Sequence, residues 1–73
     1  MEWEKIVGGN VRRLRKERGL SQEALAGEAG LAMRHLGRIE RGEGNPTVAI
    51  LGKLAEVLGV HPTTFYAENN RRA

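Results

Sequence analysis

Gly30 is the residue that most constrains the fold of this chain. It lies within the stretch 21–42, SQEALAGEAGLAMRHLGRIERG. Apolar or small residues recur at helical spacing on both sides of Gly30, which predicts two short helices. They are Leu25, Ala26 and Ala29 before the glycine, and Leu36 and Ile39 after it. Because glycine has no Cβ, Gly30 can adopt a positive φ angle that ends one helix and sets the direction of the next.

The second helix of this pair is predicted to carry a basic outer face. Arg34 and Arg38 are one helical turn apart and therefore lie on the same side of that helix. A helix-turn-helix unit exposes this face, and an arginine there can donate two hydrogen bonds to a guanine edge in the major groove of DNA. The stretch 21–42 is therefore predicted to be a DNA-binding helix-turn-helix.

A first helix is predicted before this unit. Its buried stripe consists of Val7, Val11 and Leu14. It is expected to end near Arg18, while Gly8 and Gly9 weaken its start. Ser21 can then cap the second helix, but Ala32 leaves the third helix without a side-chain cap, which costs about 1 kcal/mol.

Two more helices are predicted after a loop at 42–46. Thr47 can cap a fourth helix that ends at Gly59, and its apolar residues at helical spacing are Val48, Leu51, Leu54, Ala55 and Leu58. Pro62 opens a short fifth helix that ends near Tyr66, and the polar tail 67–73 is expected to fray. The prediction is one all-α, compact five-helix domain over residues 1–73.

Composition narrows the functional class. The 73 residues include no cysteine and one serine, and no apolar run is long enough to span a bilayer, so we expect a cytoplasmic protein without a thiolate metal site. Ser21 is used as a cap and no residues are arranged for catalysis, so neither an enzyme nor a cofactor is predicted. Nine of the twelve basic residues are arginine, and two clusters lie on the predicted first and third helices. One such cluster is often only a solvated helix face, but two of them beside a helix-turn-helix favour contact with phosphates.

Four sequence segments together carry a family resemblance. They are VGGNVRRLRKERGLSQEALA, LGRIERG, the pair Asn45-Pro46, and LGKLAEVLGV followed by a short final helix. In this order they resemble the Cro and phage-repressor type of helix-turn-helix regulators, the XRE-like family. The resemblance covers residues 7–65 and implies a lambda-repressor-like fold and a transcriptional regulator encoded by a bacterium or phage, working at the nucleoid.

The resemblance also implies roles for individual residues. Those facing base edges are Ala32, Met33, Arg34 and Arg38, and those holding phosphates are Arg15, Gln22 and Asn45. Arg15 is expected to pair with Glu40 between the first and third helices. The alternatives are a core position for Met33, an exposed helix-start residue at Gln22, and two unrelated surface charges at Arg15 and Glu40.

A homodimer on a two-fold related operator is expected, since one recognition helix covers only a few base pairs. Its seam is assigned to Phe65 and Tyr66, with Phe65 also closing the core and Tyr66 facing the partner. No membrane or small-molecule ligand is predicted. The alternative is an antitoxin or adaptor module whose main partner is another protein.

Overall fold

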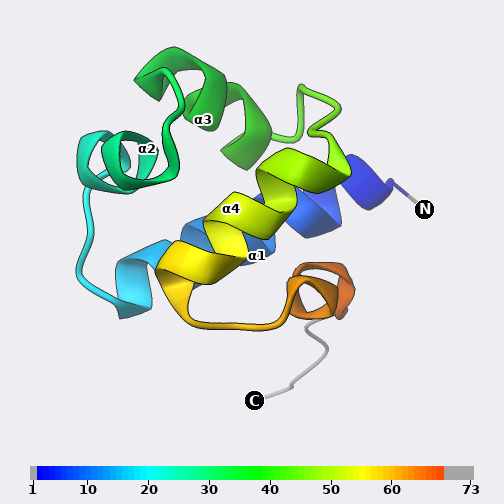
Figure 1. Ribbon diagram of the computed structural model, residues 1–73. Coiled ribbons are helices and arrows are strands. Elements are labelled where there is room, and N and C mark those ends of the chain that lie inside the picture. The colour runs from blue at the N-terminus through cyan, green and yellow to red at the C-terminus, as the bar shows by residue number, and fades with distance from the viewer. Residues whose placement is uncertain (1, 69–73) are drawn as a thin grey trace.

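The computed structural model describes residues 2–68, which form four α-helices and one short 3₁₀ helix (Figure 1). The elements are α1 (Trp3–Glu17), α2 (Gln22–Ala29), α3 (Met33–Glu40), α4 (Val48–Leu58) and the 3₁₀ helix η1 (Pro62–Tyr66). No strand occurs between residues 2 and 68, and no helix there is long and apolar enough to cross a membrane. The all-helical prediction is therefore confirmed.

The short fifth helix is present over Pro62–Tyr66, but it is a 3₁₀ helix, so the described residues form four α-helices and not five. Asn10 of α1 supplies the physical reason. Its Nδ2 donates to the carbonyl oxygens of Phe65 and Ala67, each at 2.8 Å. These bonds tie the end of η1 to α1, and the backbone is already extended at Ala67. Ala67 is thus fixed although it belongs to the tail predicted to fray, and the remainder of that tail from residue 69 lies outside the described residues.

Side-chain caps appear where hydroxyl residues were predicted to supply them. The Ser21 Oγ accepts a hydrogen bond from the Ala24 N–H at 2.9 Å, and the Thr47 Oγ1 accepts one from the Ile50 N–H at 3.1 Å. Ala32 occupies the same position before α3 and provides no such bond. Gly30 ends α2 with a φ of 75°, and the Leu31 N–H then donates to the Ala26 carbonyl at 2.8 Å. These contacts define the tight turn between α2 and α3.

The first helix begins earlier than its glycines suggested. α1 starts at Trp3 and passes through Gly8 and Gly9 without a break. Gly8 is buried against the backbone carbonyl of Ile39, where a Cβ would collide, whereas Gly9 faces open space. The glycine at position 8 therefore permits close packing of α1 on the end of α3.

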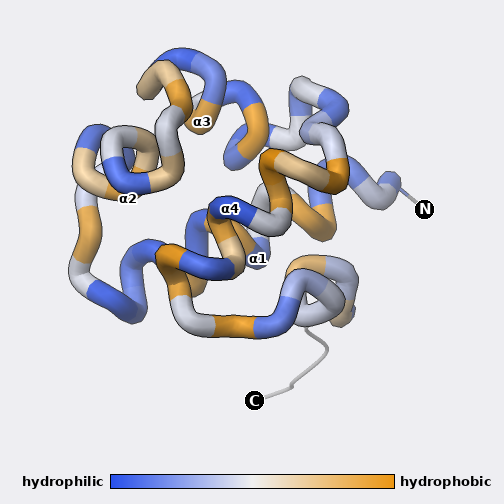
Figure 2. The backbone as a smooth tube through the Cα atoms, viewed as in Figure 1, coloured by the Kyte–Doolittle hydropathy of each residue, from blue (hydrophilic) through white to orange (hydrophobic). Residues whose placement is uncertain are grey.

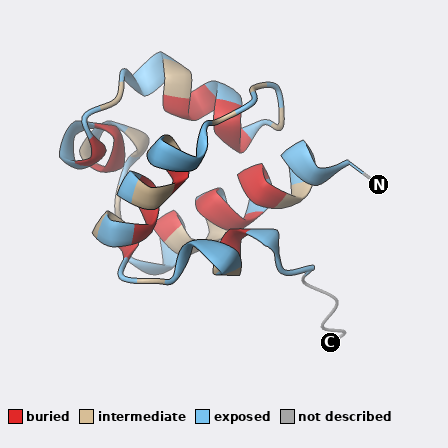
Figure 3. Ribbon diagram, turned by 45° about the vertical axis from the view of Figure 1, so that its right-hand side comes forward, coloured by how far each residue is buried: buried red, intermediate tan, exposed pale blue. Residues whose placement is uncertain are grey.

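One hydrophobic core joins all five elements. Its largest fully buried side chains are Val11, Leu25, Leu36, Ile39, Leu54, Leu58 and Phe65. Apolar residues, coloured orange, recur along α4 in Figure 2, and the buried residues of α1, α3 and α4 face one another in Figure 3. α3 contacts α1 and α2, so the core holds α3 by its inner side and leaves its outer side to solvent.

Candidate nucleic-acid interface

The outer side of α3 carries the residues that the sequence assigned to base reading. Leu36 and Ile39 are buried beneath the helix. Four residues on or next to α3 are exposed: Ala32, Met33, Arg34 and Arg38. The Met33 side chain is 52% exposed, so it is not part of the core. Two guanidinium groups one turn apart, with an apolar side chain beside them, form a surface suited to the polar and methyl groups of a major groove.

An ion pair between Arg15 of α1 and Glu40 of α3 lies beneath this surface. The Arg15 Nε lies 2.7 Å from Glu40 Oε2, and Arg15 Nη2 donates to Glu40 Oε1 at 3.0 Å. The two side chains are only 9% and 3% exposed. The alternative of two unrelated surface charges is therefore wrong. Separating the two residues would leave a buried charge without its partner, which is costly. The pair therefore fixes the position of α3 far more firmly than an exposed pair would.

Gln22 connects the start of α2 to the same carboxylate. Its Nε2 donates to Glu40 Oε1 at 3.0 Å, and its side chain is only partly exposed. Arg15 also donates through Nη1 to the Leu20 carbonyl at 2.8 Å, just before α2 begins. Three helices therefore meet at Glu40. The arrangement holds the N-terminus of α2, with its free backbone N–H groups, at a fixed place beside α3.

A shallow basic depression surrounds this network. It is lined by Arg12, Arg15, Lys16, Gln22, Glu40, Arg41 and Glu43. Arg12 and Lys16 are exposed residues of α1 and take part in no ion pair within residues 2–68. Arg15 forms part of the floor and directs three of its five N–H groups into the protein. The freely exposed positive charge of the depression therefore comes from Arg12 and Lys16.

The predicted basic cluster on α1 divides into residues with different contacts. Arg13 bonds within its own helix, to Glu17 at 3.1 Å and to Asn10 at 3.3 Å. Arg18 donates to the Leu58 carbonyl at the end of α4. These two arginines are used in intramolecular contacts, a distinction that their spacing in the sequence does not reveal.

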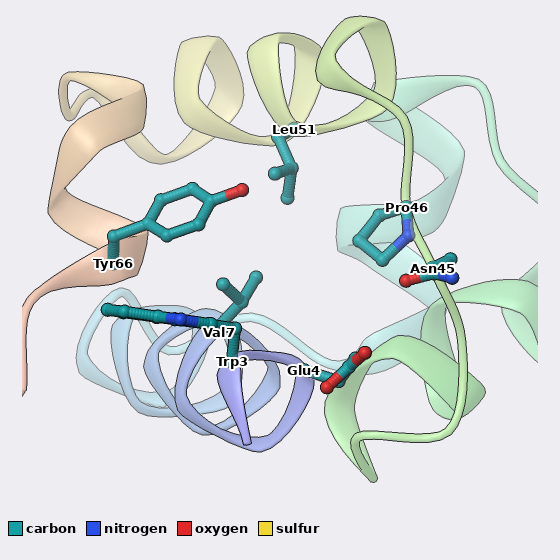
Figure 4. A pocket seen from close by; sticks show the side chains of 7 residues that line it. All are labelled: Trp3, Glu4, Val7, Asn45, Pro46, Leu51 and Tyr66. Atoms are coloured by element: carbon teal, nitrogen blue, oxygen red, sulfur yellow. The ribbon is translucent and has the colours of Figure 1, made fainter. Parts of the chain in front are cut away.

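Asn45 lies at a second concave surface, away from the depression. It is exposed in the loop between α3 and α4, and it lines a hollow of about 90 Å³ with Trp3, Glu4, Val7, Pro46, Leu51 and Tyr66. In Figure 4 the Tyr66 side chain extends across this hollow, with Trp3 beside it and Asn45 on the opposite side. Asn45 is thus separate from Gln22 and Arg15, the other two residues assigned to phosphates.

The two aromatic residues assigned to the seam differ in exposure. Phe65 is fully buried in the core and cannot contact a partner directly. Tyr66 is 47% exposed, and its ring centroid lies 5.8 Å from that of Trp3, which is 50% exposed. Beyond Tyr66 an apolar groove runs over Val48, Leu51, Gly52, Pro62 and Thr63. Trp3 is therefore an exposed aromatic residue beside Tyr66 that the sequence analysis did not assign to this surface. Nothing in the N-terminal segment indicated its contact with η1.

The surroundings of two further residues, Gly37 and Glu43, become clear only in the tertiary structure. Gly37 is buried, and a Cβ on it would lie 3.3 Å from Arg41 Nη1 and 3.8 Å from the side-chain amide of Gln22. Glu43 pairs with Arg41 on the rim of the depression. The helix-weakening glycine at position 37 was a usable signal, since a glycine inside a helix often marks close packing. No sequence pattern indicated a role for Glu43.

Comparison with known sequences places these features in a family. The helix-turn-helix family model matches residues 11–65. The chain is 47% identical over 60 residues to an uncharacterized HTH-type transcriptional regulator, y4dJ, of Sinorhizobium fredii, covering 82% of this chain and 78% of that protein. It is 37% identical to the immunity repressor protein of Bacillus phage phi105, covering 85% of this chain and 43% of the repressor. It spans only 14% of the longer regulator RamB of Mycobacterium tuberculosis.

Solved structures share the arrangement of the helices. The restriction-modification controller protein C.AhdI from Aeromonas hydrophila superposes with a TM-score of 0.84 at 36% identity, over 86% of this chain and 96% of that one. The biofilm master regulator SinR, solved in complex with DNA, gives a TM-score of 0.80 at 37% identity, over 84% and 98%. The match to the family model, over residues 11–65, includes the whole helix-turn-helix. The chain therefore belongs to the helix-turn-helix family of transcriptional regulators, which bind DNA and are not enzymes.

Proposed function

We propose that this chain binds duplex DNA in a sequence-specific manner and acts as a transcriptional regulator, with α3 lying in the major groove. The observation that carries this proposal is the exposed face with Arg34 and Arg38, held from beneath by the buried pair of Arg15 and Glu40. A reading helix must be fixed relative to the phosphates that position it, and this network links α3 to both α1 and α2. SinR, whose helices superpose on those of this chain, was solved in complex with DNA, which supports binding of DNA by this chain.

Each group of residues then has its own task. Arg34 and Arg38 donate to base edges or nearby phosphates, and Met33 with Ala32 contacts thymine methyl groups. Gln22, with Arg12 and Lys16 beside it, holds a backbone phosphate at the depression, where the N-terminus of α2 adds its partial positive charge. Arg15 supports this site from its floor, and Asn45 contacts the backbone from the loop after α3.

We further propose that two copies associate through the face formed by α4, η1 and Trp3. Trp3, Val48 and Tyr66 are large apolar or aromatic side chains, and Val48 is 85% exposed. None of the residues lining the adjacent groove is charged, so a second copy can face it without like-charge repulsion. A two-fold dimer would place its recognition helices on half-sites about 34 Å apart.

Gly52 gives the dimer proposal a specific point of contact. It lies inside α4, where glycine costs about 1 kcal/mol relative to alanine. A Cβ at this position meets nothing within 4 Å, so packing within the chain does not require the glycine. Because Gly52 lines the apolar groove, we place the close approach of a second α4 at this point.

A second candidate is supported by the same apolar face. An antitoxin or adaptor module would bind a different protein there, and binding to DNA would be secondary. Sedimentation of the purified chain separates the two, since a regulator that dimerises through this face should sediment as a dimer at tens of micromolar. A chain that sediments as a monomer alone and forms a complex only with a different protein would favour the adaptor.

For both candidate functions, we place the protein at the nucleoid of a bacterial cell, with residues 1–73 acting as one domain.

Salt dependence provides the first test of DNA binding. If phosphate contacts dominate, a plot of the logarithm of the binding constant against the logarithm of salt concentration should be a falling straight line. Its slope should be steeper by about 0.9 for each phosphate neutralised. Duplexes selected from a random pool should bind more tightly than unselected ones. An affinity that ignores salt, or that is equal for selected and unselected duplexes, would overturn the regulator assignment.

A further inference from the structure

An exposed carboxylate lies on the rim of the basic depression. Arg41 and Glu43 meet through two contacts, Nε to Oε2 and Nη2 to Oε1, each at 3.2 Å. Their side chains are 59% and 53% exposed. The other carboxylate of the depression, Glu40, is buried in its pair with Arg15. Glu43 is therefore the carboxylate of this depression that faces solvent.

The backbone fixes Glu43 in this position. Gly42 follows α3 with a φ of 77°, and the Glu43 N–H donates to the Arg38 carbonyl at 2.9 Å. This is the Schellman arrangement at a helix C-terminus, and it sets the residue directly after the glycine against the last turn. The backbone of Glu43 is thus bonded to the last turn of α3.

The Arg41 guanidinium also lies close to Gly37. Its Nη1 would lie 3.3 Å from a Cβ at Gly37, so the guanidinium lies over the part of α3 where a side chain is missing. The hydrogen bond from Arg41 and its positive charge lower the pKa of the Glu43 carboxyl. The paired guanidinium and the unpaired Arg12 and Lys16 face the same depression.

We propose that Glu43 restrains the binding of this chain to DNA phosphates by pairing with Arg41, whose guanidinium would otherwise neutralise a phosphate. The inference rests on the proposed function and adds a residue that sets its strength. An exposed ion pair is weak because water screens it, so a phosphate competes with Glu43 for the Arg41 guanidinium. The effect is on non-specific binding above all, because phosphate contacts supply essentially all of that affinity.

The test uses a duplex of random sequence, so that no operator needs to be known. Glu43→Gln should bind it about three- to tenfold more tightly at 0.1 M salt, with a salt slope steeper by about 0.9, as expected for one more neutralised phosphate. Glu56→Gln is the matched control, since it removes the same charge from an exposed position on α4. Its affinity should remain within about twofold of the unchanged chain, because charges beyond a Debye length are screened.

A double substitution tests whether Glu43 acts through Arg41. In an Arg41→Gln background, Glu43→Gln should lose most of its effect, because the freed guanidinium is the group that gains a phosphate. Equal effects of Glu43→Gln and Glu56→Gln, or an undiminished effect without Arg41, would overturn the inference while leaving DNA binding intact. If the unchanged chain bound no duplex at all, the proposed function would fail with it.

Discussion

Gly8 of α1 packs directly against the backbone carbonyl of Ile39 at the end of α3, and there is no room for a Cβ between them. Its neighbour Gly9 lies in the same helix with nothing within 4 Å of the equivalent position. The two adjacent glycines therefore have opposite roles. One sets the distance between the first helix and the reading helix, and the other only weakens α1.

Alanine at these two positions should change stability in opposite directions. Gly8→Ala should lower the free energy of unfolding by about 1–3 kcal/mol, because α3 must move away from α1. Gly9→Ala should raise it by about 0.5–1 kcal/mol through helix propensity. Urea unfolding followed by circular dichroism measures both, and equal shifts for the two variants would show that α1 and α3 are not in such close contact.

The buried ion pair of Arg15 and Glu40 should contribute far more to the free energy of unfolding than the exposed ion pair of Arg13 and Glu17 on α1. Glu40→Gln should lower the free energy of unfolding by about 3–5 kcal/mol, because Arg15 is left buried without its partner charge. Glu17→Gln, which removes the exposed partner of Arg13, should cost only about 0–1 kcal/mol. Chemical unfolding of the two variants side by side checks this. A loss for Glu40→Gln as small as that for Glu17→Gln would mean that solvent screens the pair.

The missing cap on the recognition helix can be supplied. Ala32 has the extended backbone of a capping residue, with φ of −69° and ψ of 141°, but no side-chain acceptor. Ala32→Ser should therefore stabilise the chain by about 0.5–1 kcal/mol, seen as a higher urea midpoint with unchanged slope. A neutral or lower midpoint would show that another group already satisfies these N–H donors.

Features of the fold were predictable from the sequence where a residue acts on its neighbours in the chain. Gly30, Ser21 and Thr47 act on the residues next to them, so the turn and both side-chain caps followed from the sequence. Gly8 and Asn10 act across the molecule, on α3 and on η1 respectively. A long-range contact of this kind leaves no periodic pattern, which is why the start of α1 and the type of the last helix were missed.

The same distinction applies to the candidate interface. The exposed face with Arg34 and Arg38 followed from helical spacing alone. Which basic residues of α1 are available to a ligand did not, because Arg13 and Arg18 are bonded to groups that only the tertiary structure brings near. The Arg41 to Glu43 contact depends on the backbone at the end of α3, so it too required the structure.

The proposed seam should be sensitive to one methyl group. Gly52→Ala should raise the stability of the monomer by about 0.5–1 kcal/mol, because it removes a mid-helix glycine. If a second α4 packs there, the same change should shift sedimentation towards monomer, as should Tyr66→Ala. Gly9→Ala is the control, because it adds a methyl group away from the seam and should leave the dimer intact. A dimer that survives both seam substitutions would place the interface elsewhere.

Selection of binding sites from a random duplex pool tests the central claim most directly, when the unchanged chain is compared with Arg34→Ala and Gln22→Ala. Arg34→Ala should lose about 1–3 kcal/mol of binding free energy and relax the preference at one or two base positions. Gln22→Ala should weaken all sequences more evenly and keep the preferred bases, since its contact is with the backbone. If Arg34→Ala retained the original preference at every position, the exposed face of α3 would not be the surface that reads DNA.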